Sequence, residues 1–340
     1  MKERFLYIDQ LKGVAIFLVV FGHSIQNNTL ESANQSLFVW LYSFHMPLFM
    51  FISGYIAFKT THINNVADYG VFIKKRSISL LIPYFAWPLL VYNFFFKKKE
   101  HIDFITQVWN VITKWNSLWY LWFLFFLMLC YSVFHILSKS VNKKNNILID
   151  IIIALGIAGV LLLMKPLGFF VSTSSFLLYF LFLFAGAFAS KYSIISKLML
   201  NQVMFSVCLI LFIVLSGRYD YNDMGSMNKL LKIIIAFSAI STIYYIVRKI
   251  KWNATVDNWV QLWGRNTIVI YTTHFAINRF FIGVPLFSHL GLVSLILVNA
   301  ACALIVITAC LLILKLVELC PPLNLLLYGH TIKKSPKTIA

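Results

Sequence analysis

The sequence contains few charged residues. Only 12% of its 340 residues are Asp, Glu, Lys or Arg, whereas soluble domains average about 25%. Hydrophobic residues make up 60% of the chain, and this excludes an ordinary soluble domain. Repeated apolar runs of about 20 residues instead predict an all-α, polytopic integral membrane helix bundle.

Cysteine is scarce as well. The five cysteines are odd in number and form no CxxC pair, which excludes a disulfide framework and a thiolate zinc site. The histidines show no HxxxH or HxH spacing, so we expect no bound metal. The net charge of +18 suggests nucleic-acid binding, but no RNA-binding motif or zinc-finger spacing accompanies it. Cationic loops that orient a membrane protein explain this charge better.

The chain shows no internal repeat, no cleavable signal peptide and no separate soluble domain, so residues 1–340 are expected to form one membrane domain. The segment 102–115 has a helical apolar period, is too short to span a bilayer and is expected to lie at the interface. With the N-terminus inside, most Lys and Arg fall in inner segments, which predicts that both termini are cytoplasmic. We predict ten transmembrane helices, at about 8–27, 38–58, 78–96, 117–137, 147–164, 168–190, 198–216, 229–248, 266–283 and 291–315.

The first predicted span contains ionisable residues, which are costly inside a bilayer. It reads YIDQLKGVAIFLVVFGHS over 7–24. Lys12 and His23 are 11 residues apart, which places them on one helix face and ~16 Å apart along the axis. Asp9 lies one turn before Lys12 and can pair with it. The span therefore presents a polar stripe with a cation near the inner end and an imidazole past the midplane.

Two further histidines are predicted at a similar depth. His45 lies near the middle of the second span, which runs antiparallel to the first. His274 lies near the middle of the ninth span, with Asn278 one turn further along the same face. A histidine in a membrane helix can also serve only to hydrogen-bond a neighbouring helix, and this alternative stays open for all three.

Five short motifs, in this order, carry a resemblance to a known family. LKGVAIFLVVFGH resembles the opening of the membrane acyltransferase-3 family, in which ten residues separate an Arg or Lys from a His, as they separate Lys12 from His23. The same segment resembles the fucose 4-O-acetylase-like branch of that family. The other four segments that resemble family motifs are FHMPLFMFISGY, KKRSISLLIPYFAW, LWYLWFLF and WGRNTIVIYTTH.

The resemblance implies an acyl-CoA-dependent O-acetyltransferase of the bacterial plasma membrane. Its donor would be acetyl-CoA, and its acceptor a hydroxyl of a surface polysaccharide or a lipid-linked precursor. His23 would act as the general base, because imidazole titrates near neutrality, and His45 would orient it or stabilise the oxyanion. The motifs would supply phosphate-binding cations for the donor, and the candidates are Lys12, Lys74, Lys75 and Arg76. Asp9 would support Lys12, and a possible additional site comprises His274, Asn278 and Arg265.

A transporter or flippase for lipid-linked sugars is the main alternative. Such a protein also has many spans and buried polar residues, but it often shows paired halves with broken helices. The sequence shows no such pairing. A polysaccharide polymerase is a third possibility, but the large Arg-rich outer loop that would favour it is absent.

Overall fold

The computed structural model describes residues 6–28, 32–92, 104–113, 117–164, 172–223, 225–278 and 291–329. Within these ranges every regular element is a helix, which confirms the all-α prediction. Helices satisfy all their backbone hydrogen bonds internally, and this is what a chain in lipid requires.

Among the described residues, six helical stretches are long and apolar enough to cross a membrane. This supports a multi-pass membrane protein, but it does not confirm the predicted count of ten spans. The stretches lie in α1 (Leu6–Asn28), in α2 (Ser32–Tyr42) joined to α3 (His45–Thr60), and in α8 (Trp119–Val141), α10 (Thr173–Lys191), α13 (Ser226–Lys249) and α16 (Leu292–Val317).

Two of the other predicted spans differ from a straight long helix. The apolar helix α9 (Ile147–Leu163) has 17 residues. The predicted span 198–216 corresponds mainly to α12 (Gln202–Ser216), which is bent by 66° relative to the short helix before it, α11 (Ser193–Met199). The side chain of Asn201 caps α12 by accepting hydrogen bonds from two backbone N–H groups. This cap fixes the bend because it starts a new helix at that point.

The remaining two predicted spans are short or irregular. Helix α15 (Thr267–Asn278) has 12 residues, and the end of the predicted span 266–283 lies outside the described residues. The described part of the predicted span 78–96 is divided into the π-helical η1 (Ser77–Leu81), α5 (Ile82–Ala86) and the π-helical η2 (Trp87–Tyr92), and residues 93–96 lie outside the described residues. Pro83 and Pro88 lie in this stretch. Each proline lacks a backbone donor and clashes with the preceding turn, which disrupts regular α-helix.

Four further short helices among the described residues lie outside the ten predicted spans. Helix α7 (Phe104–Thr113) confirms the helical prediction for the middle of the 102–115 segment, whose two ends lie outside the described residues. Three further helices were not predicted from the apolar runs, because they are short or amphipathic. These are α4 (Val66–Arg76), α14 (Ala254–Arg265) and α17 (Pro321–Tyr328).

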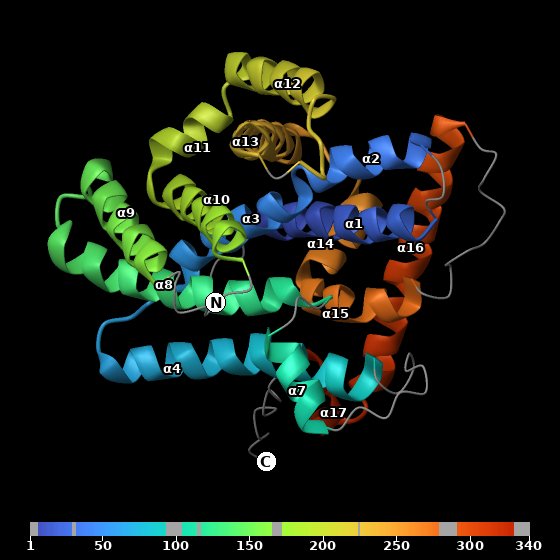
Figure 1. Ribbon diagram of the computed structural model, residues 1–340, viewed down its shortest axis with the longest axis horizontal. Helices are drawn as coiled ribbons and strands as arrows, with labels where there is room; N and C mark the ends of the chain where they lie inside the picture. Colours follow the sequence, from blue (N-terminus) through green and yellow to red (C-terminus); the bar gives the residue numbers. More distant parts are fainter. Residues whose placement is uncertain are drawn as a thin grey trace.

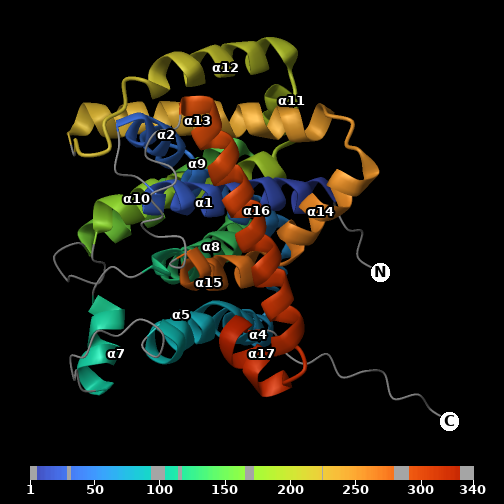
Figure 2. The same cartoon turned by 90° about the vertical axis from the view of Figure 1, so that its right-hand side faces the viewer.

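The helices form three groups (Figures 1 and 2). Helices α12 and α13 lie along one side, and α4, α5, α7 and α17 lie along the opposite side. The middle group contains α1, α3, α8, α10 and α15. Helix α1 contacts α3, α13, α14, α15 and α16, so the polar stripe of α1 is enclosed by segments from both ends of the chain.

Glycines allow two helix pairs to touch backbone to backbone. A Cβ at Gly54 of α3 would lie 1.7 Å from the Leu183 carbonyl oxygen of α10, and one at Gly186 of α10 would lie 1.9 Å from that of Phe51. Helices α1 and α14 cross in the same way, at Gly13 against Val260 and at Gly264 against Asp9. Any side chain at these positions would push the helices apart, so the glycines set both crossings.

A buried ion pair joins the ends of three other helices. Asp150 of α9 is fully buried, and its carboxylate lies 2.6 Å from the Lys191 ammonium at the end of α10. Ser138 and Asn142 donate hydrogen bonds to one oxygen of Asp150, and Tyr192 donates to the other. The carboxylate is fully satisfied, so the network holds α8, α9 and α10 in register.

Candidate functional site

The polar stripe on α1 forms as the sequence predicts. Lys12 Nζ lies 3.3 Å from Asp9 Oδ1, which confirms the i,i+3 pair. The Asp9 backbone contacts Gly264 of α14 closely, so this pair is anchored where the two helices cross. The next residue of α14, Arg265, is therefore held near Lys12.

A cavity of about 240 Å³ lies beside Lys12. Five helical segments line it, namely α1, α3, η1, α8 and α15, together with Arg76 at the end of α4 and Arg265 at the end of α14. Arg265 is exposed, so the cavity reaches the surface there.

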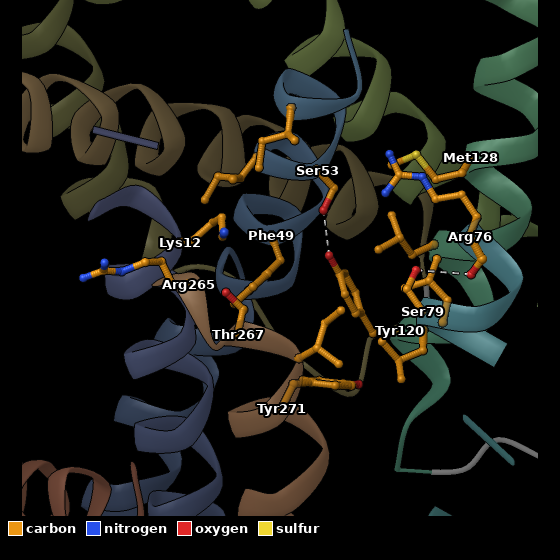
Figure 3. A pocket seen from close by; sticks show the side chains of 16 residues that line it. Lys12, Phe49, Ser53, Arg76, Ser79, Tyr120, Met128, Arg265, Thr267 and Tyr271 are labelled. Atoms are coloured by element: carbon orange, nitrogen blue, oxygen red, sulfur yellow. Dashed lines mark hydrogen bonds between the residues drawn. The ribbon is translucent and has the colours of Figure 1, made fainter. Parts of the chain in front are cut away.

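The three cationic side chains lie on opposite walls of the cavity. Figure 3 shows Lys12 and Arg265 on one side and Arg76 on the other. The Arg76 guanidinium also packs over the Phe72 ring, with its carbon 5.4 Å from the ring centroid. Because the π-helical η1 begins immediately after Arg76, the irregular backbone brings both Arg76 and Ser79 to the cavity. Cations on two walls suit a ligand with several negative charges.

Aromatic rings line the end of the cavity that lies towards the histidines. The rings of Phe49 and Tyr120 have centroids 5.7 Å apart, and those of Tyr120 and Tyr271 are 5.4 Å apart. The Tyr120 hydroxyl lies 2.8 Å from the Ser53 hydroxyl (Figure 3). We call Phe49, Tyr120 and Tyr271 the aromatic partition.

Histidines lie one helical turn beyond the aromatic partition. His45 precedes Phe49 by four residues on α3, and His274 follows Tyr271 by three residues on α15. On α15 the ring centroids of Tyr271 and His274 are 5.9 Å apart. Along α3 and α15, the rings of the partition therefore lie between the other cavity-lining residues and the histidines.

The structure brings the predicted histidines together. The rings of His23 and His274 are 5.1 Å apart. The Tyr42 ring lies 4.5 Å from that of His45 and 6.3 Å from that of His23. His45 and His274 are buried, and each has Nδ1 2.9 Å from the carbonyl oxygen one turn earlier. These bonds put the proton on Nδ1 and leave Nε2 as the acceptor.

His23 differs from the other two in its polar surroundings. Its Nδ1 lies 3.0 Å from Gln26 Oε1, so it carries a proton and leaves Nε2 free to accept one. The Gln26 side chain is exposed, and His23 is partly exposed. His23 is therefore the histidine of this cluster that lies closest to solvent. Nε2 of His274 is buried and has no hydrogen-bond partner among the described residues.

The other predicted residues are placed less uniformly. Asn278 is buried one turn beyond His274. Lys74 and Lys75 are exposed on α4 and do not line the cavity. No group of three or more His, Cys, Asp or Glu side chains suited to a metal ion occurs in the part of the chain that the structure describes.

Sequence reasoning missed several residues of this region. Tyr42 links His23 to His45, while Ser53 and Tyr120 form a polar pair inside the cavity. Tyrosine and serine are common in membrane helices, so their types gave no signal. Only the i, i+4 spacing of Phe49 and Ser53 on one helix face could have indicated that these two line the same cavity.

Fold and site together define a multi-pass membrane protein with a cationic cavity that leads to a histidine cluster. A family model described as an acyltransferase domain matches residues 5–315. The chain therefore belongs to the acyltransferase-3 family, and this confirms the resemblance seen in the motifs.

Curated relatives match over shorter stretches. Nodulation protein NolL of Sinorhizobium fredii is 33% identical over 153 residues, which cover 40% of this chain and 39% of the relative. Nodulation protein NolL of Mesorhizobium japonicum is 34% identical over 95 residues, or 27% of this chain and 25% of the relative. The matches thus span less than half of each relative's length. No solved structure matches the chain.

Proposed function

We propose that the protein is a membrane O-acetyltransferase. It takes an acetyl group from acetyl-CoA and transfers it to a hydroxyl of a surface polysaccharide or its lipid-linked precursor. The observation that carries the proposal is the arrangement of α1, α3 and α15. Each of these helices contributes to the cationic cavity at one level and a histidine at the next. Membership of an acyltransferase family supports the same reaction class.

The cavity fits the thioester arm of acetyl-CoA. Its volume of about 240 Å³ is below the about 300–1,000 Å³ of pockets that enclose drug-sized ligands. The narrow pantetheine arm enters, and the phosphorylated nucleotide stays at the mouth. There Lys12, Arg76 and Arg265 bind phosphate oxygens, with the two arginines able to bind in bidentate geometry. The exposed Lys74 and Lys75 add positive potential that attracts the anionic donor.

His23 acts as the general base. Its free Nε2 accepts the hydroxyl proton while the hydroxyl oxygen attacks the acetyl carbon. The new C–O bond forms, the C–S bond breaks, and His23 returns the proton to the departing coenzyme A thiolate. His45 and His274 hold the geometry around His23, and the Nδ1–H of His23 stays bonded to Gln26. General-base catalysis typically contributes about 10²–10⁴-fold to the rate.

The donor enters from the cytoplasm in this proposal. The Lys12 end of α1 then faces the cytoplasm, as the distribution of Lys and Arg predicts. The His23 end, with exposed Gln26, faces the opposite side, where the acceptor arrives. The aromatic partition lies between the cavity and the histidines, so in this mechanism the acetyl end of the donor passes these rings to meet the hydroxyl at His23.

The test is acetyl transfer by the purified full chain. Radiolabelled acetyl-CoA is supplied together with glycans and lipid-linked glycans extracted from the cells that make the protein. His23→Ala should insert normally and lose acetylation by about 10² or more, the scale of a lost general base. His45→Ala should lose less, because in this mechanism it only positions other groups.

Two results would contradict the proposal. If a well-expressed His23→Ala variant kept full acetyl transfer, His23 would be a structural histidine. If the wild-type protein never consumed acetyl-CoA but moved labelled lipid-linked sugars across a vesicle membrane, the transporter reading would replace the acetyltransferase.

A further inference from the structure

Aromatic rings gather around the histidines on the side away from the cavity. The rings of Phe38 and Tyr42 in α2 stack with centroids 3.9 Å apart. The ring of Tyr221, in the loop between α12 and α13, lies 5.9 Å from that of Tyr42 and 5.5 Å from that of Phe38. Tyr221 is 42% exposed, so this aromatic group reaches the surface.

Two more tyrosines extend the group towards the bundle interior. Tyr179 of α10 lies within electrostatic range of Tyr42, Tyr219 and Tyr221. Tyr179 and Tyr219 are both 8% exposed. We call Tyr42, Tyr179, Tyr219 and Tyr221 the tyrosine cluster. It brings together rings and hydroxyl groups from three separate parts of the chain, with Tyr42 and Tyr221 on its more exposed side.

The tyrosine cluster is in direct contact with the proposed base. The Tyr42 hydroxyl donates a hydrogen bond to Gln26 Oε1 over 3.0 Å, and the same Gln26 oxygen lies 3.0 Å from His23 Nδ1. The oxygen of Tyr42 is itself 3.5 Å from His23 Nδ1. A molecule stacked on the tyrosine cluster would therefore lie next to His23.

A lysine completes the cluster. Lys232 of α13 is only partly exposed, and its ammonium lies 5.6 Å from the centroid of the Tyr219 ring. A positive charge on Lys232 also disfavours a positive charge on His45. Among the residues that the structure describes, no carboxylate forms an ion pair with Lys232. A partly buried cation without an anionic partner is costly unless a ligand supplies the charge.

We propose that the tyrosine cluster and Lys232 form the acceptor site and select an anionic glycan. Tyrosine rings stack on the apolar faces of sugar rings, and their hydroxyls bond to sugar hydroxyls. Lys232 pairs with an anionic group of the acceptor, which is either the phosphate of a lipid-linked sugar or the carboxylate of an acidic sugar. The inference rests on the proposed function, because it assumes that a glycan is acetylated at His23.

The experiment separates the extracted glycans by anion exchange into a neutral and an anionic pool. Each pool is incubated with the purified full chain and radiolabelled acetyl-CoA. The label is expected in the anionic pool. Mild acid, which releases glycans from lipid phosphates, and chemical reduction of carboxyl groups then show which anion the acceptor carries.

Three variants test the role of Lys232. Lys232→Met keeps the length of the side chain and removes its charge, and it should raise the KM for the anionic acceptor by about tenfold or more, the scale of a charge-assisted contact. Its KM for acetyl-CoA should stay unchanged. Lys232→Arg should restore most of the acceptor affinity. Lys229→Met, at an exposed position one turn earlier on α13, is the matched control and should behave as wild type.

The outcomes separate the two proposals. Label in the neutral pool, with equal KM values for wild type and Lys232→Met, would overturn the anionic acceptor site and leave the acetyltransferase intact. An equal rise in the KM for the acceptor in Lys232→Met and Lys232→Arg would mean that the positive charge of residue 232 does not contribute to binding. This result would also overturn the anionic acceptor site. Absence of label in both pools with the wild-type protein would contradict the proposed function itself, and the inference would fall with it.

Discussion

Arg76 and Lys75 are neighbours in the chain but have different surroundings. Arg76 lines the cavity and packs over Phe72, whereas Lys75 is exposed. Arg76→Ala should raise the KM for acetyl-CoA by about tenfold or more with little change in kcat, because a hydrogen bond to a charged group contributes about 1.5–3 kcal/mol and this contact is distant from the reacting carbon. Steady-state kinetics with varied acetyl-CoA measures it.

The same assay contains its controls. Lys75→Ala should change the KM less, and the change should disappear at high salt, because exposed charges are screened. Lys144→Ala, in the exposed connection between α8 and α9, should have no effect. A KM in Arg76→Ala equal to that of wild type would leave Arg76 with a role in membrane orientation alone.

Sequence reasoning at this scale worked best for residues on one helix. The Asp9–Lys12 pair follows directly from their spacing, and the structure confirms it. The gathering of His23 with His274 depends on the packing of α1 against α15, which are far apart in the chain. The sequence predicts that His23 and His274 lie at a similar depth in the membrane. Depth alone does not predict which face of each helix is in contact with the other helix. Nothing in the sequence singles out Lys232, because a single lysine near a helix end is typical of any membrane protein.

At the scale of helices, the α3–α10 crossing depends on two glycines. Gly54→Ala should destabilise the protein by about 1–3 kcal/mol or more, the range for overpacked cores, because the new methyl group would lie 1.7 Å from a backbone oxygen. Thermal unfolding of the detergent-solubilised protein measures the change. The backbone at Leu183 cannot move aside as a flexible side chain could.

Gly156→Ala on α9 is the matched control. Nothing lies within 4 Å of a Cβ at that position, and alanine favours helix over glycine by about 1 kcal/mol, so this variant should be as stable as wild type or slightly more so. Equal unfolding temperatures for Gly54→Ala and wild type would show that α3 and α10 are packed less closely than described here.

The long apolar helices could be predicted from hydropathy alone, since about 20 apolar residues suffice to span a bilayer. The helices that complete the site were harder to predict. Helix α14 positions Arg265 but is amphipathic rather than apolar, and η1 positions Arg76 through an irregular turn that no periodicity reveals. The start of α14 depends on the side-chain cap at Asn253. The irregular turn of η1 depends on the proline at residue 83.

At the scale of the whole molecule, the orientation in the membrane is a prediction with a direct test. With both termini in the cytoplasm, the α8–α9 connection faces inwards and the α12–α13 loop faces outwards. Lys143 and Asp223 are exposed in these two segments. In the variants Lys143→Cys and Asp223→Cys, a membrane-impermeant maleimide should reach the two cysteines from opposite sides of the membrane.

Cys320 is exposed, so the labelling requires a background in which it is replaced by serine. The expected result is that Asp223→Cys labels in intact cells and Lys143→Cys labels only after the cells are opened. Labelling of both positions from the same side would contradict the topology, and with it the assignment of the donor to the cytoplasmic face.

The aromatic partition has a consequence for the energy supply of the cell. In the proposed mechanism the donor approaches from one face of the membrane and the acceptor from the other, and a continuous file of water between the two approaches would conduct protons. The packed rings of Phe49, Tyr120 and Tyr271 fill the place where the two would join. In the proposed mechanism, the packed rings would block such a file of water and so preserve the proton-motive force between turnovers.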